Sequence, residues 1–165
     1  MIHAIIIDDE RGNRENLQSM LQEYCPQVRV VASAPSAKEG RAAINSFKPE
    51  LVFLDIEMPV MNGFMMLEEM GEIDFEVIFV TAFDKYAIRA IKLGALDYLL
   101  KPFTGEDLMI SVKRAEVKIQ SGISGKNKME ILFSNLKMKG KSPVRIAIPD
   151  HEGLQFIEIK RILRI

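Results

Sequence analysis

The sequence has 165 residues, a length that suits one full domain with an appendage. Hydrophobic residues make up 48% of it, and the charges of its 22 basic and 23 acidic side chains nearly cancel. No apolar run approaches the roughly 20 residues of a membrane-spanning helix, the start lacks the basic segment of a signal peptide, and the one cysteine, Cys25, excludes an internal disulfide bond. We therefore expect a cytoplasmic protein with no membrane partner, in which Cys25 is a packing residue.

Short apolar runs alternate with amphipathic segments along residues 1–120, which predicts five strand–helix units. The strands are expected at Ile2–Asp8, Val28–Ser33, Leu51–Asp55, Glu76–Val80 and Asp97–Leu100. The helices are expected at Arg11–Tyr24, Ala37–Phe47, Gly63–Met70, Lys85–Leu93 and Gly105–Gln120. Ser36 with Glu39 predicts a capping box, and Thr104 with Asp107 predicts a similar one. The alternation is typical of an α/β fold with a parallel sheet and right-handed crossovers.

The sequence changes character after residue 120. Residues 121–143 are rich in small and basic side chains and are expected to form a linker. Three strand-like runs follow, of which the first two predict a β-hairpin: Val144–Ile148, Leu154–Ile159 and Ile162–Ile165. Because so small a sheet is marginal by itself, we expect residues 144–165 to be a fragment of a larger module and the sequence to be part of a longer chain.

Charge is distributed unevenly between these regions. Residues 1–125 carry 13 basic and 19 acidic side chains, a net charge of −6, whereas residues 126–145 carry six basic side chains and one acidic, a net charge of +5. Such asymmetry is typical of a second module with a different partner, although a solvated linker accounts for the charge equally well.

Polar residues stand at the carboxyl ends of four of the predicted strands: Asp8 with Asp9, Asp55, Thr81 and Lys101. Because functional groups gather at the carboxyl ends of strands in an open α/β sheet, we expect these side chains to meet. Three neighbouring carboxylates repel one another unless a cation neutralises them, and a ligand set made only of oxygens suits Mg²⁺. A nucleophilic carboxylate, a hydroxyl and a fixed positive charge are the groups needed for phosphoryl transfer onto an aspartate.

These motifs resemble the receiver domain of bacterial response regulators: Asp8-Asp9, LDIEMPVMNG around Asp55, Thr81-Ala82 and DYLLKPF. The resemblance covers residues 1–120 and implies a flavodoxin-like, five-stranded parallel sheet of order 2-1-3-4-5 with helices on both faces. It implies that a sensor histidine kinase passes a phosphoryl group to Asp55 in a Mg²⁺-dependent reaction. Such a domain catalyses its own phosphorylation and slow dephosphorylation and is not otherwise an enzyme.

The resemblance assigns roles to individual residues. Asp9 would bind Mg²⁺ directly, Asp8 would act through water, and Asp55 and the backbone carbonyl of Glu57 would complete the metal site. The phosphoryl-binding and switch residues would be Thr81, Ala82, Lys101 and Tyr98, with a cis peptide bond before Pro102. The resemblance also implies that Glu57 and Phe83 tune the lifetime of the phosphoryl group. It implies a dimer face that includes Ile88, Ala95 and Tyr98.

The segment RIAIPDHEGLQFIEIKRILRI resembles the opening of a LytTR-type DNA-binding domain. This resemblance implies that the complete protein controls transcription through DNA, and that phosphorylation forms a homodimer whose two C-terminal modules reach adjacent half-sites. With only the first strands of that module present, DNA binding by these residues alone is expected to be weak or absent.

Two other classes of function remain open at this point. A dehalogenase-type phosphohydrolase also uses an aspartyl phosphate and Mg²⁺, but it would need a D-x-D pattern after the first strand, where this chain has Asp8-Asp9, and room for a cap domain. A receiver that acts only through protein–protein contacts is the other alternative.

Overall fold

The computed structural model describes residues 1–121, 145–150 and 153–158. The chain divides into two units, Met1–Leu132 and Phe133–Ile165. The elements of the first unit are β1 (Ile2–Ile7), α1 (Arg11–Tyr24), β2 (Val28–Ala34), α2 (Ala37–Phe47), β3 (Leu51–Leu54), α3 (Gly63–Met70), β4 (Glu76–Thr81), the 3₁₀ helix η1 (Asp84–Tyr86), α4 (Ala87–Lys92), β5 (Asp97–Leu100) and α5 (Gly105–Gln120).

In the second unit, β6 (Arg145–Asp150) and β7 (Gly153–Glu158) form an antiparallel pair that runs from Arg145 opposite Glu158 to Asp150 opposite Gly153. The expected hairpin pairing is therefore present. The predicted linker over residues 122–143 and the predicted third strand at Ile162–Ile165 lie outside the described residues.

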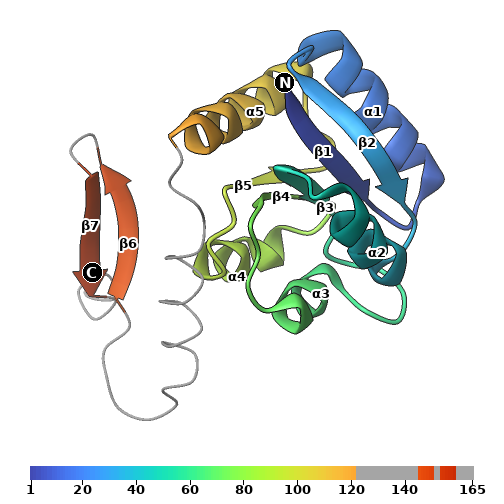
Figure 1. Ribbon diagram of the computed structural model, residues 1–165. Coiled ribbons are helices and arrows are strands. Elements are labelled where there is room, and N and C mark those ends of the chain that lie inside the picture. Colours follow the sequence, from blue (N-terminus) through green and yellow to red (C-terminus); the bar gives the residue numbers. More distant parts are fainter. Residues whose placement is uncertain (122–144, 151–152, 159–165) are drawn as a thin grey trace. The chain divides into compact units, whose positions relative to one another are not determined.

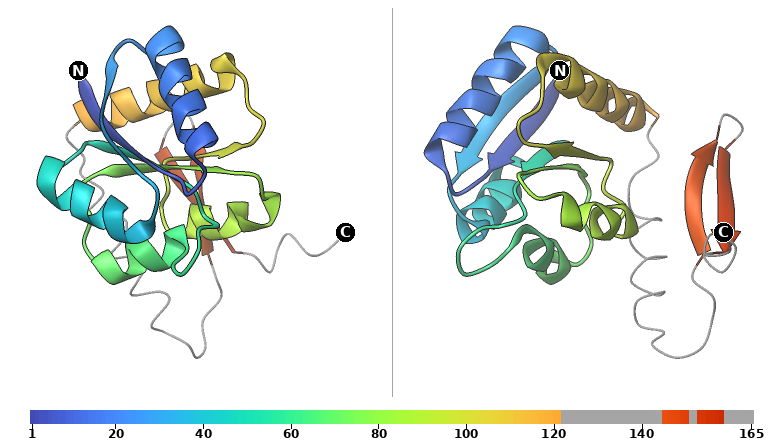
Figure 2. Two further views of the ribbon diagram at one scale, coloured as in Figure 1. Left: turned by 90° about the vertical axis from the view of Figure 1, so that its right-hand side faces the viewer. Right: turned by 180° about the vertical axis from the view of Figure 1, so that it is seen from behind.

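The five strands of the first unit form a parallel sheet in the order β2-β1-β3-β4-β5, which confirms the predicted fold. Ile7 of β1 lies opposite Leu54 of β3, and Thr81 of β4 lies opposite Leu100 of β5, so these strands end at one edge of the sheet. Helices α1 and α5 lie on one face, and α2, α3 and α4 lie on the other (Figures 1 and 2).

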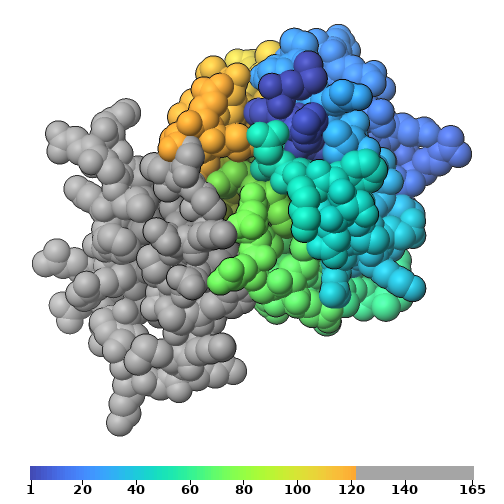
Figure 3. Space-filling model, in the orientation of Figure 1, coloured from blue at the N-terminus to red at the C-terminus, as the bar shows by residue number. Residues whose placement is uncertain are grey.

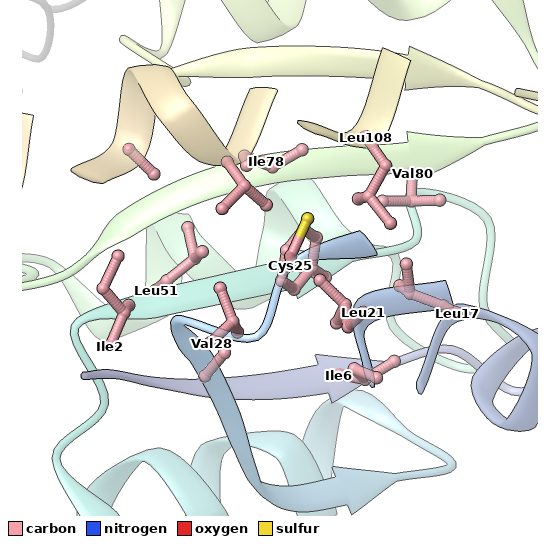
Figure 4. Packing of buried hydrophobic residues seen from close by; sticks show 14 of the residues in the cluster. Ile2, Ile6, Leu17, Leu21, Cys25, Val28, Leu51, Ile78, Val80 and Leu108 are labelled. Carbon is pink, nitrogen blue, oxygen red and sulfur yellow. The ribbon is translucent and has the colours of Figure 1, made fainter. Parts of the chain in front are cut away.

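The three central strands, β1, β3 and β4, are largely buried on both faces, as expected for apolar runs rather than alternating patterns. All four residues of β3 are buried, as is Ala4–Ile7 of β1. Leu17 and Leu21 of α1 and Leu108 of α5 lie over these strands in one apolar cluster (Figure 4). Cys25 is fully buried in the same cluster, and burial raises the pKa of its thiol, in agreement with a packing role.

On the opposite face, α2 and α3 lie next to each other, as Figure 3 shows. At Gly40, α2 lies close against the sheet, since a Cβ atom there would lie 2.5 Å from the Cδ1 atom of Ile7. A glycine inside this helix therefore reflects close helix–sheet packing.

Helix ends follow the predicted signals, with two differences. Thr104 and Asp107 form a complete capping box at α5, whereas at α2 the Ser36 hydroxyl accepts from the Glu39 N–H and donates to its carboxylate. The predicted helix at Lys85–Leu93 is instead η1 followed by α4, because the Ala87 N–H donates to the Asp84 carbonyl and tightens the first turn. Across the described ranges, no helix has both the length and the apolar character needed to cross a membrane.

Candidate functional site

Three carboxylates meet at the carboxyl edge of the sheet. Asp8 and Asp9 directly follow β1, Asp55 directly follows β3, and one oxygen of each lies within 4.8 Å of the others. Both strands end one residue earlier than predicted. After β3, the Asp55 carboxylate accepts the Ile56 N–H at 2.6 Å, which turns the chain away from the sheet. Asp8 and Asp55 are only 4% and 8% exposed, so their mutual repulsion is poorly screened by water.

Lys101 follows β5 and brings a positive charge to this cluster. Its Nζ lies 2.6 Å from Oδ2 of Asp8 and 3.1 Å from Oδ2 of Asp55. Burial alone would lower the pKa of Lys101, but the hydrogen bond to Asp8 and the charges of both carboxylates outweigh burial and raise it. Lys101 is therefore held as an ammonium ion between the two carboxylates. The peptide bond from Lys101 to Pro102 is cis.

Burial opposes the ionisation of the Asp55 carboxyl. Burial raises the pKa of its carboxyl above the ordinary value of 3.8, and the charge of Asp8 adds to the rise, although Lys101 and the Ile56 N–H act in the opposite direction. A buried carboxylate with a raised pKa beside a fixed cation is typical of a functional site.

Thr81 is the last residue of β4, one position beyond the predicted end of that strand. It is fully buried, and its hydroxyl has no hydrogen-bond partner among the described residues. Its carbonyl accepts the N–H of Lys101 at 2.8 Å, which links the hydroxyl-bearing and ammonium-bearing strand ends. A buried hydroxyl without a partner carries a free-energy cost unless a ligand satisfies it.

The loop after β4 is connected to the rest of the site at two points. The Tyr98 hydroxyl donates to the backbone carbonyl of Phe83. The Tyr86 hydroxyl donates to the Glu57 carboxylate at 2.8 Å, and Lys85 lies 3.3 Å from the same oxygen. The bond from Tyr86 and the charge of Lys85 lower the pKa of Glu57. Tyr86 was not among the predicted residues, because no motif marks an aromatic residue at this distance from Thr81.

Gly63 is a second residue of the site that was not predicted from the sequence. It lies close against the backbone carbonyl of Asp55. A Cβ atom at Gly63 would lie 2.4 Å from the Asp55 carbonyl oxygen. The Gly63 N–H also donates to the Ile56 carbonyl at 2.8 Å, and the Asn62 side chain caps α3 directly before it. The Asn62-Gly63 pair is a turn signal, but a turn signal does not indicate that Gly63 meets the Asp55 carbonyl.

Gly63→Ala is expected to lower the free energy of unfolding by about 1–3 kcal/mol and to shift the Asp55 backbone, because the methyl group cannot fit without backbone movement. Urea denaturation and the amide NMR shifts of Asp55 measure the two effects. Gly12→Ala in α1 is the matched control, since a Cβ atom there has no neighbour within 4 Å. Equal effects of the two substitutions would contradict the role assigned to the close approach at Gly63.

The remaining predicted residues surround this centre. Ala82 and Phe83 are exposed in the loop after β4, Ile88 is exposed on α4, and Ala95 and Tyr98 are half-buried near β5. Their assignment to phosphoryl binding, lifetime tuning or a dimer face stays a prediction. The three clustered carboxylates offer only oxygen atoms, so their chemistry fits Mg²⁺ rather than a metal that prefers nitrogen or sulfur.

Comparisons with known proteins agree with this geometry. The response regulator receiver domain model matches residues 4–113. The chain is 44% identical over 106 residues to the transcriptional regulatory protein BtsR of Escherichia coli, covering 62% of this chain and 43% of BtsR. It is 35% identical over 161 residues to the sensory transduction protein LytT of Oceanobacillus iheyensis, covering 92% of this chain and 64% of LytT.

Among solved structures, the response regulator TrrA of Thermotoga maritima, crystallised in complex with Mg²⁺–BeF, superposes with a TM-score of 0.62 at 30% identity over 70% of this chain and 99% of TrrA. The chain spans about half the length of several curated relatives that it matches. The domain match, which covers most of the chain, and the shared sheet order show that this chain belongs to the receiver-domain family of two-component response regulators.

Proposed function

We propose that Asp55 accepts a phosphoryl group from the phosphohistidine of a sensor histidine kinase. An Asp55 carboxylate oxygen attacks phosphorus, the P–O bond forms as the P–N bond breaks, and the histidine leaves with the electron pair of that bond. The observation that carries the proposal is the convergence of the Asp8, Asp9 and Asp55 carboxylates beside the Lys101 ammonium group.

Asp9, Asp55 and the backbone carbonyl of Glu57 would hold Mg²⁺, with Asp8 acting through water. The ion would supply positive charge that offsets the negative charge of the carboxylates and of the incoming phosphoryl group. The donor set supports this assignment, as does the Mg²⁺–BeF complex of the related TrrA.

Lys101 binds a phosphoryl oxygen as a point charge, and Thr81 with the backbone of Ala82 binds the others. The Thr81 hydroxyl is available for this because it has no partner among the described residues. Movement of the Thr81 hydroxyl toward Asp55 changes the conformation of the loop after β4. The Phe83 carbonyl in this loop accepts the Tyr98 hydroxyl, so Tyr98 changes conformation with the loop and transmits the change to the surface. Glu57 and Phe83, at the exposed rim, tune the lifetime of the phosphoryl group.

The complete protein is proposed to control transcription by binding DNA through a LytTR-type domain that begins within residues 144–165, after a linker over residues 121–143. The relatives BtsR and LytT and the antiparallel β6–β7 pair support this output. A receiver that acts only through protein contacts is the alternative, and specific DNA binding by the full-length gene product separates the two.

The metal and phosphoryl roles are tested by labelling with acetyl phosphate. In the presence of Mg²⁺ the protein should gain one phosphoryl group, detected by intact mass, and the product should be stable in acid and labile in base. EDTA should abolish the labelling because the carboxylates then repel the donor. Labelling of equal extent in EDTA would contradict the proposed Mg²⁺ requirement.

Phosphorylation is proposed to form a homodimer through Ile88, Ala95 and Tyr98. Beryllofluoride with Mg²⁺, a phosphoryl mimic, should therefore double the mass seen by light scattering. Ile88→Lys should block the increase, because Ile88 is 68% exposed on α4 and a buried lysine charge opposes association. Met65→Lys on α3, at another exposed apolar side chain, is the control and should dimerise normally. A wild-type mass unchanged by beryllofluoride would count against this dimer.

A further inference from the structure

The placement of Asp8 and Asp9 on the same side of the chain needs an explanation. In an extended strand, neighbouring side chains point to opposite faces. Yet carboxylate oxygens of both residues lie within 4.8 Å of each other and of Asp55. Strand β1 ends at Ile7, and the backbone bends at Asp9.

Arg14, on α1, is bonded to the backbone of this bend. Its Nη1 atom donates to the carbonyl of Asp8 at 2.7 Å and to the carbonyl of Asp9 at 3.1 Å. The Arg14 side chain is half-buried, and no carboxylate among the described residues forms an ion pair with it. Two consecutive carbonyl oxygens therefore accept hydrogen bonds from one guanidinium nitrogen. In an extended strand, consecutive carbonyl groups would point in opposite directions.

The side chain of Asp8 also holds the bend, from its other end, because its bond with the Glu10 N–H closes a turn across Asp9. One oxygen of Asp8 accepts the Glu10 N–H at 2.8 Å and lies 3.3 Å from Nδ2 of Asn13, and the other is paired with Lys101. These bonds orient the carboxylate of Asp8. Among the described residues, the donor to the backbone carbonyl of Asp9 is Nη1 of Arg14.

We propose that Arg14 is a positioning residue of the acidic site, which holds the bend at Asp8 and Asp9 so that both carboxylates face Asp55 and bind a divalent cation together. This inference rests on the proposed Mg²⁺ site. Arg14 does not contact the cation. It acts through two backbone carbonyls, in the way that groups around a metal site orient the ligands themselves.

Electrostatics and positioning predict opposite effects when Arg14 is removed. A positive charge near a cation site repels the cation, so loss of the charge alone would strengthen Mg²⁺ binding or leave it unchanged. Loss of the two hydrogen bonds allows the bend to relax and separates Asp9 from its partners, which weakens binding. Because outer groups of this kind typically affect metal affinity by 10–100-fold, we expect the positioning effect to dominate.

The experiment is a Mg²⁺ titration followed by the amide NMR shifts of Asp9, Asp55 and Glu57. Arg14→Met should weaken Mg²⁺ binding by about tenfold or more. The matched control is Arg11→Met, which removes the same charge from the same helix turn. The Arg11 side chain is highly exposed and forms an ion pair with Glu15. That variant should bind Mg²⁺ as tightly as the wild-type protein or slightly more tightly.

A purely structural role would lower stability without changing the affinity of the folded protein, so the titration is performed where each variant is fully folded by circular dichroism. If Arg14→Met does not fold, Arg14→Gln replaces it, since the shorter amide side chain cannot reach both carbonyls. A Mg²⁺ affinity of the folded Arg14 variant equal to or above that of the wild type would overturn the positioning role of Arg14 but not the proposed metal site. A wild-type protein that shows no Mg²⁺ shifts would overturn the proposed metal site, and the inference with it.

Discussion

Asp55→Asn is expected to abolish labelling by acetyl phosphate and, at the same time, to raise the free energy of unfolding at neutral pH by about 1 kcal/mol. The labelling is lost because an amide cannot form the acyl phosphate. The stability rises because burial and the charge of Asp8 raise the pKa of Asp55, so its ionisation costs stability in the folded state.

The pH dependence of this effect has a definite sign. Because the folded-state pKa of Asp55 is raised, its protonated form contributes stability fully below the ordinary value of 3.8, and that contribution is lost as the pH rises through the raised pKa. The advantage of Asp55→Asn should therefore be absent below pH 3.8 and grow above it, as measured by urea denaturation at several pH values. Glu72→Gln, at an exposed carboxylate, is the control and should show neither change.

Lys101→Met is expected to lower the free energy of unfolding at neutral pH by about 3 kcal/mol, because it leaves two buried carboxylates without their partner. The Lys101 side chain is 18% exposed, which places the effect at the lower end of the range for buried ion pairs. Added Mg²⁺ should restore part of this stability, since a cation bound by the folded state takes over the neutralisation. Denaturation with and without Mg²⁺ measures both effects.

Two further variants separate the contributions of Lys101. Lys113→Met removes an ammonium group from an exposed ion pair with Glu116, so it should change stability by less than about 0.5 kcal/mol. Lys101→Arg keeps the charge but not the point-charge geometry, so it should retain more stability than Lys101→Met while weakening the response to beryllofluoride. A loss in Lys113→Met as large as that in Lys101→Met would contradict the assigned burial effect.

The fold and the central residues could be predicted from the sequence because both depend on short-range patterns. Apolar runs located the carboxyl ends of all five strands to within one residue. Because functional groups gather at the carboxyl ends of strands in an open α/β sheet, Asp8, Asp9, Asp55 and Lys101 could be placed at one edge. The strand order came from the family resemblance, since periodicity carries no information on which strands are neighbours.

Residues that act through backbone geometry could not be predicted in this way. The close approach of Gly63 to the Asp55 carbonyl and the bonds of Arg14 to two carbonyls exist only after the loops fold together. The bond from Tyr86 to Glu57 joins residues 29 positions apart, beyond the reach of any local motif. The division of the fourth helix into η1 and α4 likewise depends on one turn hydrogen bond at Ala87.

Locating the acyl phosphate in the sequence decides whether Asp55 is the phosphoryl acceptor. After reaction with acetyl phosphate and Mg²⁺, borohydride reduces an aspartyl phosphate to homoserine, and peptide mass spectrometry identifies the position. Homoserine is expected at position 55 in the wild-type protein and at no position in Asp55→Asn. Homoserine at Asp8 or Asp9, or at an unrelated position that persists in Asp55→Asn, would contradict the role of Asp55.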